Sequence, residues 1–157
     1  MDVARTKSIQ PDLIGSIFDL PDEVTGVTSV YLGHILEHLE FDLIPAALAK
    51  LWERCEQGCM VAAVGPDCDI GRAWVDAGKI SEKEYRKMDI TPPELIPGGS
   101  HNGYSHRWRC TTPLMVDLLV ASGLGLVQKE DILSSKLKPF PVVCKIGWQG
   151  AVIGVVQ

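Results

Sequence analysis

The residues best suited to chemistry gather in two segments of the chain, and each segment contains histidine. The first carries His34, Glu37 and His38, and the second is Ser100–Cys110, which carries His106. Imidazole has an unperturbed pKa of about 6.5, so it can accept or donate a proton near neutral pH. We therefore predict a general acid–base site in which His34 and His106 are catalytic. The alternative is that His34 is a loop histidine that caps or packs locally.

The second segment, SHNGYSHRWRC, combines aromatic, basic and small residues. Binding residues concentrate on loops that a rigid scaffold holds, which favours a substrate-binding role for Tyr104, His106 and Arg107. In the alternative interpretation, Trp108 packs into the core and its charged neighbours stay solvated.

Two aspartates in the sequence GPDCD, Asp67 and Asp69, follow the apolar run Met60–Val64. Open α/β sheets bind ligands outside the carboxyl ends of their strands. Asp67 is therefore a further catalytic candidate, which could hold substrate or accept a proton. The alternative is a solvated turn after Pro66.

The first segment also fits an H-x-x-E-H zinc pattern, with His34 and His38 as ligands and Glu37 as base. That pattern needs both histidines on one helix. Gly33 and the β-branched run before it place His34 where a strand ends. We therefore predict no metal for this pattern.

Strand and helix patterns alternate along the chain and must position these residues. Val27–Leu32 is rich in β-branched residues and Met60–Val64 is continuously apolar, so both are expected to be strands. Between them, Asp42 is expected to cap a helix over Leu43–Glu56, which Gly58 ends.

The second half continues the alternation. Ser81 and Glu84 form a capping box for a short helix, and Thr112 is expected to be the N-cap of a helix that Gly123 ends. Two further strands are expected at Leu124–Asp131 and Gly150–Val156. Consecutive β-α-β units predict an α/β fold, with a mostly parallel sheet in three layers, α/β/α.

Composition bounds the class of protein. The chain has 157 residues, which fits a single domain over 1–157 with an insertion at about 80–97. Its net charge is −5 without a basic cluster, which disfavours a general nucleic-acid surface. We find no signal peptide and no apolar run that could span a membrane. Its five cysteines form no disulfide pattern, so reduced thiols in the cytoplasm are expected.

The stretch Tyr31–Pro66 resembles the second half of the Rossmann-like domain of class I S-adenosylmethionine (SAM)-dependent methyltransferases, close to their type 11 group. VYLGHILEHL matches the family's fourth strand and loop, VAAVGPD its fifth strand, and LGLVQ and GAVIGVV its last two strands. The resemblance implies a SAM cofactor and methyl transfer to an acceptor that the sequence does not identify.

The resemblance also implies cofactor-binding positions. Asp2 corresponds to the acid that holds the cofactor ribose, and Ser16, followed by Ile17, stands where many relatives have an acid for the adenine. Gly33 and His34 would lie near the methionine end of the cofactor. The glycine-rich loop of the family belongs upstream of these segments, so the expected fold is truncated at its N-terminal strands and SAM binding by the isolated chain is expected to be weak or absent.

Two functions follow from this resemblance. The chain is either a methyltransferase or a non-catalytic remnant of one, which would act as an interaction or regulatory protein, for instance on a full-length relative. Loss of the first strands would expose one edge of Val27–Leu32, and exposed edges invite pairing. We expect a homodimer to cover this edge, or an antiparallel return of the preceding segment.

Overall fold

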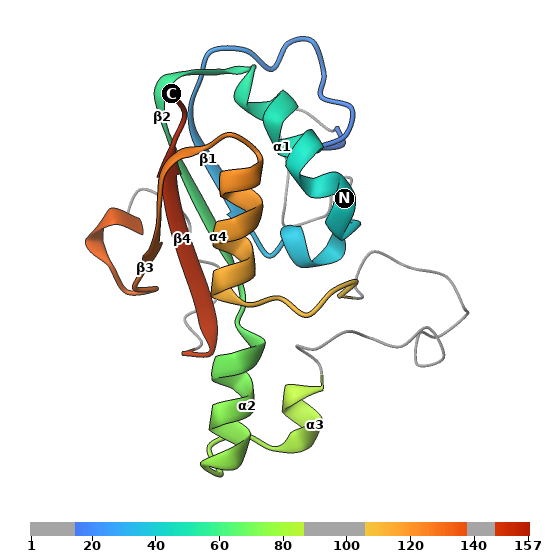
Figure 1. Ribbon diagram of the computed structural model, residues 1–157, viewed down its shortest axis with the longest axis vertical. Coiled ribbons are helices and arrows are strands. Elements are labelled where there is room, and N and C mark those ends of the chain that lie inside the picture. Colours follow the sequence, from blue (N-terminus) through green and yellow to red (C-terminus); the bar gives the residue numbers. More distant parts are fainter. Residues whose placement is uncertain (1–14, 87–105, 138–146) are drawn as a thin grey trace, which may run out of the picture.

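The computed structural model describes residues 15–86, 106–137 and 147–157 (Figure 1). Expectations for Asp2, for Tyr104 and for most of the proposed insertion lie outside the described residues. The described chain forms, in order, β1 (Val27–Gly33), the 3-10 helices η1 (Leu36–His38) and η2 (Phe41–Leu43), α1 (Ile44–Trp52), β2 (Cys55–Pro66), α2 (Cys68–Asp76), α3 (Glu82–Tyr85), α4 (Thr112–Ala121), β3 (Gly125–Glu130), the 3-10 helix η4 (Ser135–Leu137) and β4 (Gln149–Val155).

The described strands form one four-stranded sheet in the order β1-β2-β4-β3. β1 and β2 are parallel, but β4 runs antiparallel to both of its neighbours, β2 and β3. The sheet is therefore mixed: β1, β2 and β3 run in one direction and β4 opposes them, so the expectation of a mostly parallel sheet holds for three of the four described strands and fails for β4. The physical reason is that β4 inserts between β2 and β3 and pairs with both in the antiparallel direction, a pairing between distant segments that local sequence patterns do not report.

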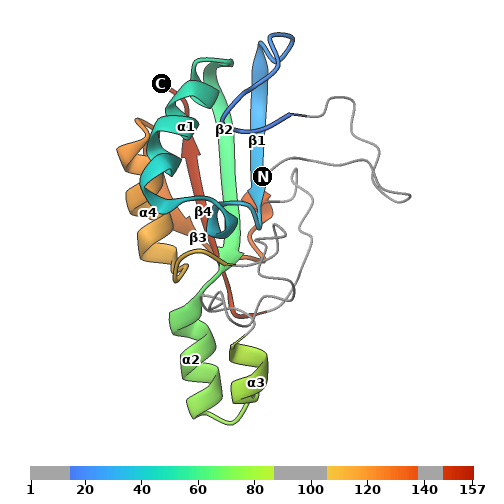
Figure 2. The same ribbon diagram turned by 90° about the vertical axis from the view of Figure 1, so that its right-hand side faces the viewer.

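Helices α1 and α4 lie together on one face of the sheet (Figure 2). Their buried side chains, among them Ile44, Leu48, Met115 and Leu119, pack with the strands into the main core. On the other face, Leu137 of η4 packs against a smaller cluster of buried residues. α2 and α3 extend beyond the carboxyl end of β2 (Figure 1). Within the described residues, the α-helices that pack on the sheet thus cover one face, not the two that we expected.

Several expected helix ends are displaced. α1 begins at Ile44 with Leu43 as its N-cap, and Asp42 lies inside η2 without capping it. The helix ends at Trp52 because the chain is already extended at Cys55, which pairs with Val27 of β1. Gly58 does have a positive φ of 85°, but it lies within β2 and does not end the helix.

The caps near the carboxyl edge of the sheet agree better with the sequence. Ser81 and Glu84 form the expected capping box of α3. α4 is capped one residue earlier than expected, because Thr111 and not Thr112 accepts from the Leu114 N–H. Among the described residues, no helix has both the length and the apolar character that crossing a membrane requires.

Candidate functional site

The candidate site lies where β1 and β2 end and β4 begins. His34 directly follows β1 and has a left-handed backbone with a φ of 53°, which is uncommon for a residue other than glycine. Its N–H donates to the Val64 carbonyl at 2.8 Å, so the pairing of β1 with β2 continues into this residue. The left-handed turn breaks the strand and leads the chain into η1.

His34 stands between two buried polar side chains. Its Nδ1 lies 3.0 Å from Oε1 of Glu37, and its Nε2 lies 2.7 Å from the amide nitrogen of Gln149. Glu37 is only 1% exposed and Gln149 only 4%. A buried carboxylate and a buried amide therefore fix the plane of the imidazole, while the His34 side chain itself keeps 27% exposure.

Gly65 of β2 lies next to the Glu37 carboxylate. A Cβ at position 65 would lie 3.4 Å from Cys110 Sγ and 3.7 Å from the second carboxylate oxygen of Glu37, Oε2. No hydrogen-bond partner of this Oε2 is found among the described residues. Burial, and then the nearby charge of Glu37, raise the pKa of Cys110 far above its usual range, so this thiol stays protonated and is no nucleophile.

The segment before α4 closes over Glu37. His106 packs edge-on against His38, with ring centroids 5.0 Å apart. The Arg107 N–H donates to the Glu37 carbonyl at 2.8 Å, and its guanidinium pairs with Glu40. Trp108 is buried and donates from Nε1 to the Leu36 carbonyl at 2.9 Å. Trp108 thus packs into the core while His106 reaches the candidate site, so this segment combines features of both interpretations.

Asp67 has a different role from the solvated turn that we considered, because it is only 4% exposed. It is the N-cap of α2, and its Oδ1 accepts from the N–H groups of Asp69 and Ile70. Its Oδ2 accepts from the N–H and hydroxyl of Thr112. Each carboxylate oxygen thus has two donors, which fits a residue that joins α2 to α4 better than a general base.

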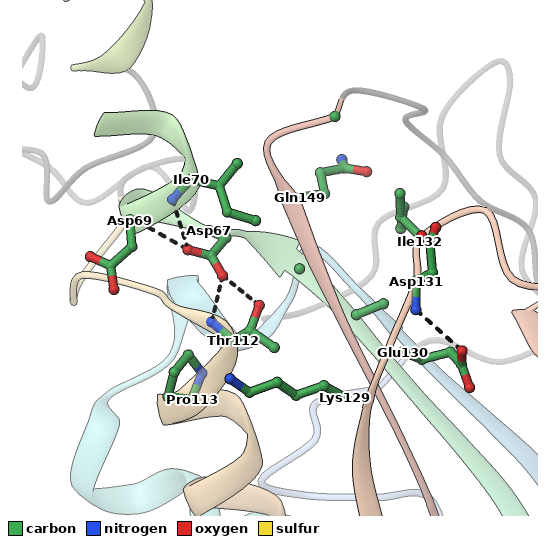
Figure 3. Close-up of a pocket in the computed structure, with 13 residues that line it drawn as sticks. Asp67, Asp69, Ile70, Thr112, Pro113, Lys129, Glu130, Asp131, Ile132 and Gln149 are labelled. Atoms are coloured by element: carbon green, nitrogen blue, oxygen red, sulfur yellow. Dashed lines mark hydrogen bonds between the residues drawn. The ribbon is translucent and has the colours of Figure 1, made fainter. Parts of the chain in front are cut away.

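A cavity of about 520 Å³ opens beside this cap (Figure 3). Its charged lining comes from two places: Asp67 and Asp69 at the start of α2, and Lys129, Glu130 and Asp131 at and just after the end of β3. Gln149 lines the cavity and also contacts His34, so it connects the two. The Oε1 of Gln149 has no hydrogen-bond partner among the described residues, which leaves a buried acceptor at the cavity.

The predicted cofactor residues that the structure describes have local packing roles. The Ser16 hydroxyl accepts from the Phe18 N–H at 3.2 Å, and Ile17 packs against the main core. A side chain at Gly33 would collide with the ring of Tyr31, so packing alone requires glycine there. None of these contacts tests whether the residues bind a cofactor.

Comparisons with known proteins support the fold. No family model matches the chain, and no curated protein matches it. Among solved structures, PigF with S-adenosylhomocysteine (SAH) has a TM-score of 0.52 at 15% identity, over 90% of this chain and 33% of that chain. A protein assigned as an O-methyltransferase from Nostoc punctiforme has a TM-score of 0.50 at 12% identity, over 91% of this chain and 35% of that chain.

At these identities the likeness establishes a fold class. The chain has a methyltransferase-like α/β fold, and it spans about a third of the length of the solved structures that it matches. This agrees with the class of fold that the sequence resembles.

Sequence reasoning missed the two buried partners of His34. Glu37 was considered as the base of the zinc pattern, and Gln149 was not considered. Helix α2 was also missed, although an aspartate directly after an apolar strand is a recognised signal for a helix N-cap.

Proposed function

We propose that this chain is a SAM-dependent methyltransferase-like protein in which His34 removes a proton from an oxygen or nitrogen acceptor. The observation that carries the proposal is the contact between His34 Nδ1 and the buried Glu37 carboxylate, at the carboxyl ends of two parallel strands. The fold supports the class of reaction, and the histidine–carboxylate pair supports the role of the residue.

The contact between His34 and Glu37 determines which imidazole nitrogen of His34 accepts the proton. Glu37 Oε1 accepts the Nδ1–H of His34, which leaves Nε2 as the basic nitrogen, and in the described structure Nε2 faces the Gln149 amide. An acceptor hydroxyl would take the place of this amide and transfer its proton to Nε2. The oxygen would then attack the methyl carbon of SAM in line with the carbon–sulfur bond, and SAH would leave.

Binding of the cofactor can be measured without knowledge of the acceptor. We propose that the isolated chain binds SAM and SAH only weakly, because the described residues show no glycine-rich turn between a strand and the N-terminus of a helix. Isothermal titration calorimetry with SAH should give a dissociation constant weaker than about 100 µM. A micromolar or tighter value would contradict the weak-binding proposal and favour an active enzyme outright.

A second candidate function is a non-catalytic interaction protein. β1 is a terminal strand of the described sheet, and its first half, with Thr28 and Ser29, is exposed. We propose that a second copy of the chain pairs with this strand, since closed two-fold dimers are the commonest homo-oligomers. This would suit a regulatory protein as well as an enzyme.

Light scattering tests the dimer. We expect twice the mass of the chain at micromolar concentration, together with slow hydrogen exchange at Thr28 and Ser29. A Ser29→Pro variant should dissociate the dimer, because proline removes a backbone donor from the strand. Ser135→Pro, at the first position of η4, serves as the control, because the N–H of a first helical residue has no partner within the helix. A monomer at every concentration, with rapid exchange at both residues, would rule the dimer out.

A further inference from the structure

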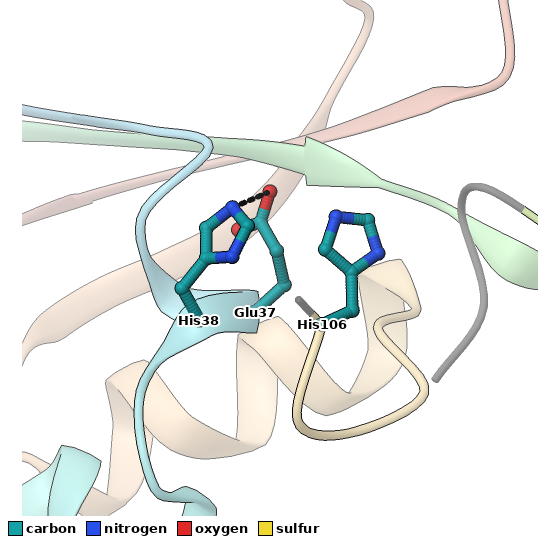
Figure 4. Close-up of side chains that lie close together, drawn as sticks. All are labelled: Glu37, His38 and His106. Atoms are coloured by element: carbon teal, nitrogen blue, oxygen red, sulfur yellow. Dashed lines mark ion pairs between the residues drawn. The ribbon is translucent and has the colours of Figure 1, made fainter. Parts of the chain in front are cut away.

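Three side chains with metal-binding atoms meet where η1 contacts the segment before α4. Glu37 and His38 come from η1, and His106 approaches them from the other side (Figure 4). One ligand atom from each residue can be chosen so that all three atoms lie within 4.8 Å of one another. This set differs from the H-x-x-E-H pattern of the sequence, because His34 lies outside the helix and contacts Gln149.

The carboxylate of this cluster is in an environment that favours a cation. Glu37 is 1% exposed, and its Oε2 has no hydrogen-bond partner among the described residues. Its Oε1 lies 3.0 Å from His34 Nδ1 and 4.0 Å from His38 Nε2. Burying a carboxylate is costly unless positive charge or hydrogen bonds compensate both oxygens. A cation bound at Oε1, on the side of His38, would offset the negative charge of this buried carboxylate.

We propose that Glu37, His38 and His106 bind a divalent metal ion, with Zn²⁺ as the best match. Two imidazole nitrogens and one carboxylate oxygen are a donor set that zinc accepts, and three protein ligands leave a fourth position for water or a substrate oxygen. Donors on one zinc ion lie about 3.3 Å apart. Because the ligand atoms of the cluster lie within 4.8 Å of one another, they must approach by up to about 1.5 Å. We expect rotation of the imidazoles of His38 and His106 to bring the donors closer together.

His34 would support this site from outside. It contacts the same Glu37 oxygen that lies nearest to His38, and a hydrogen bond to a ligating carboxylate orients it for the metal. His34 is therefore a positioning residue for the metal, separate from the role proposed for it in methyl transfer.

The experiment uses the tag-free chain after treatment with a chelator. Calorimetric titration with Zn²⁺ should show one ion bound per chain with a dissociation constant tighter than about 1 µM. Co²⁺ in place of Zn²⁺ should give the visible absorption of a site with nitrogen and oxygen ligands. His106→Ala and His38→Ala should each weaken zinc binding at least about 100-fold, since even loss of an outer partner costs 10–100-fold.

The matched control is Asp69→Asn, which changes an exposed carboxylate outside the cluster and should bind zinc as tightly as the unmodified chain. His34→Gln keeps a donor toward Glu37 and should weaken zinc binding by about tenfold, the smallest loss expected for an outer partner. Thermal unfolding of each metal-free variant shows whether it folds. Zinc should raise the unfolding temperature of the unmodified chain and of His34→Gln but not of His106→Ala. The proposal is overturned if the unmodified chain binds no zinc, or if folded His106→Ala and His38→Ala bind it as tightly. Either result is independent of the SAH titration.

Discussion

Replacement of His34 by alanine is expected to slow SAM-dependent methyl transfer by about 10²–10⁴-fold, the usual contribution of a positioned general base. The imidazole is the group between the Glu37 carboxylate and the Gln149 amide, and alanine leaves nothing there to take the proton. The measurement is SAH formation, followed by mass spectrometry, with millimolar SAM and a panel of phenolic and amine acceptors.

A second variant distinguishes the contribution of the base, His34, from that of its partner, Glu37. Glu37→Gln keeps the volume and one hydrogen bond to Nδ1 but removes the negative charge, so we expect a smaller loss, of about tenfold or more. Circular dichroism should show that both variants remain folded. If His34→Ala transfers methyl groups at the unmodified rate, His34 is not the base and the role proposed for the pair is wrong.

The second large effect is expected in stability. Asp67→Ala should lower the free energy of unfolding by about 3 kcal/mol, because it removes a helix cap and leaves buried donors without acceptors. The donors that lose their acceptor are the N–H groups of Asp69, Ile70 and Thr112 and the Thr112 hydroxyl. Urea unfolding followed by tryptophan fluorescence measures the change.

Two further variants make this result specific. Asp69→Ala alters the neighbouring exposed carboxylate, whose ion pair with Arg109 is on the surface, and should change stability by less than about 0.5 kcal/mol. Asp67→Asn can still cap α2 but presents an amide N–H₂ to Thr112, so an intermediate loss is expected. Equal stability of Asp67→Ala and Asp69→Ala would show that the cap contributes little.

The parts of the fold that sequence could predict are those with strong local signals. Val27–Gly33 and the apolar part of β2 were predicted as strands because β-branched residues and short, continuous apolar runs favour strands. The capping box of α3 was predicted because its two hydrogen bonds depend only on residues three apart. His34 was placed at the end of a strand for the same reason.

The parts that could not be predicted depend on long-range pairing. Glu37 reads as a surface residue of a loop, and it is buried because the segment of Trp108, distant in the sequence, packs against η1. Gln149 reaches His34 across 115 residues of sequence. The antiparallel direction of β4 leaves no mark on its own apolar pattern, which is the same for either direction.

The order of the strands in the sheet differs from the order in which they are synthesised, because of the position of β4. β4 is made after β3, yet it occupies the middle of the sheet, between β3 and β2. A ribosome releases the chain from its N-terminus at about 5–20 residues per second. β1 and β2 can pair as soon as both have emerged, but Met60–Pro66 must wait for Gln149–Val155, its partner in the finished sheet. During that interval β3 is the nearer strand, and its direct pairing with β2 would have to be undone, so a nascent chain is expected to depend on chaperones until β4 is released.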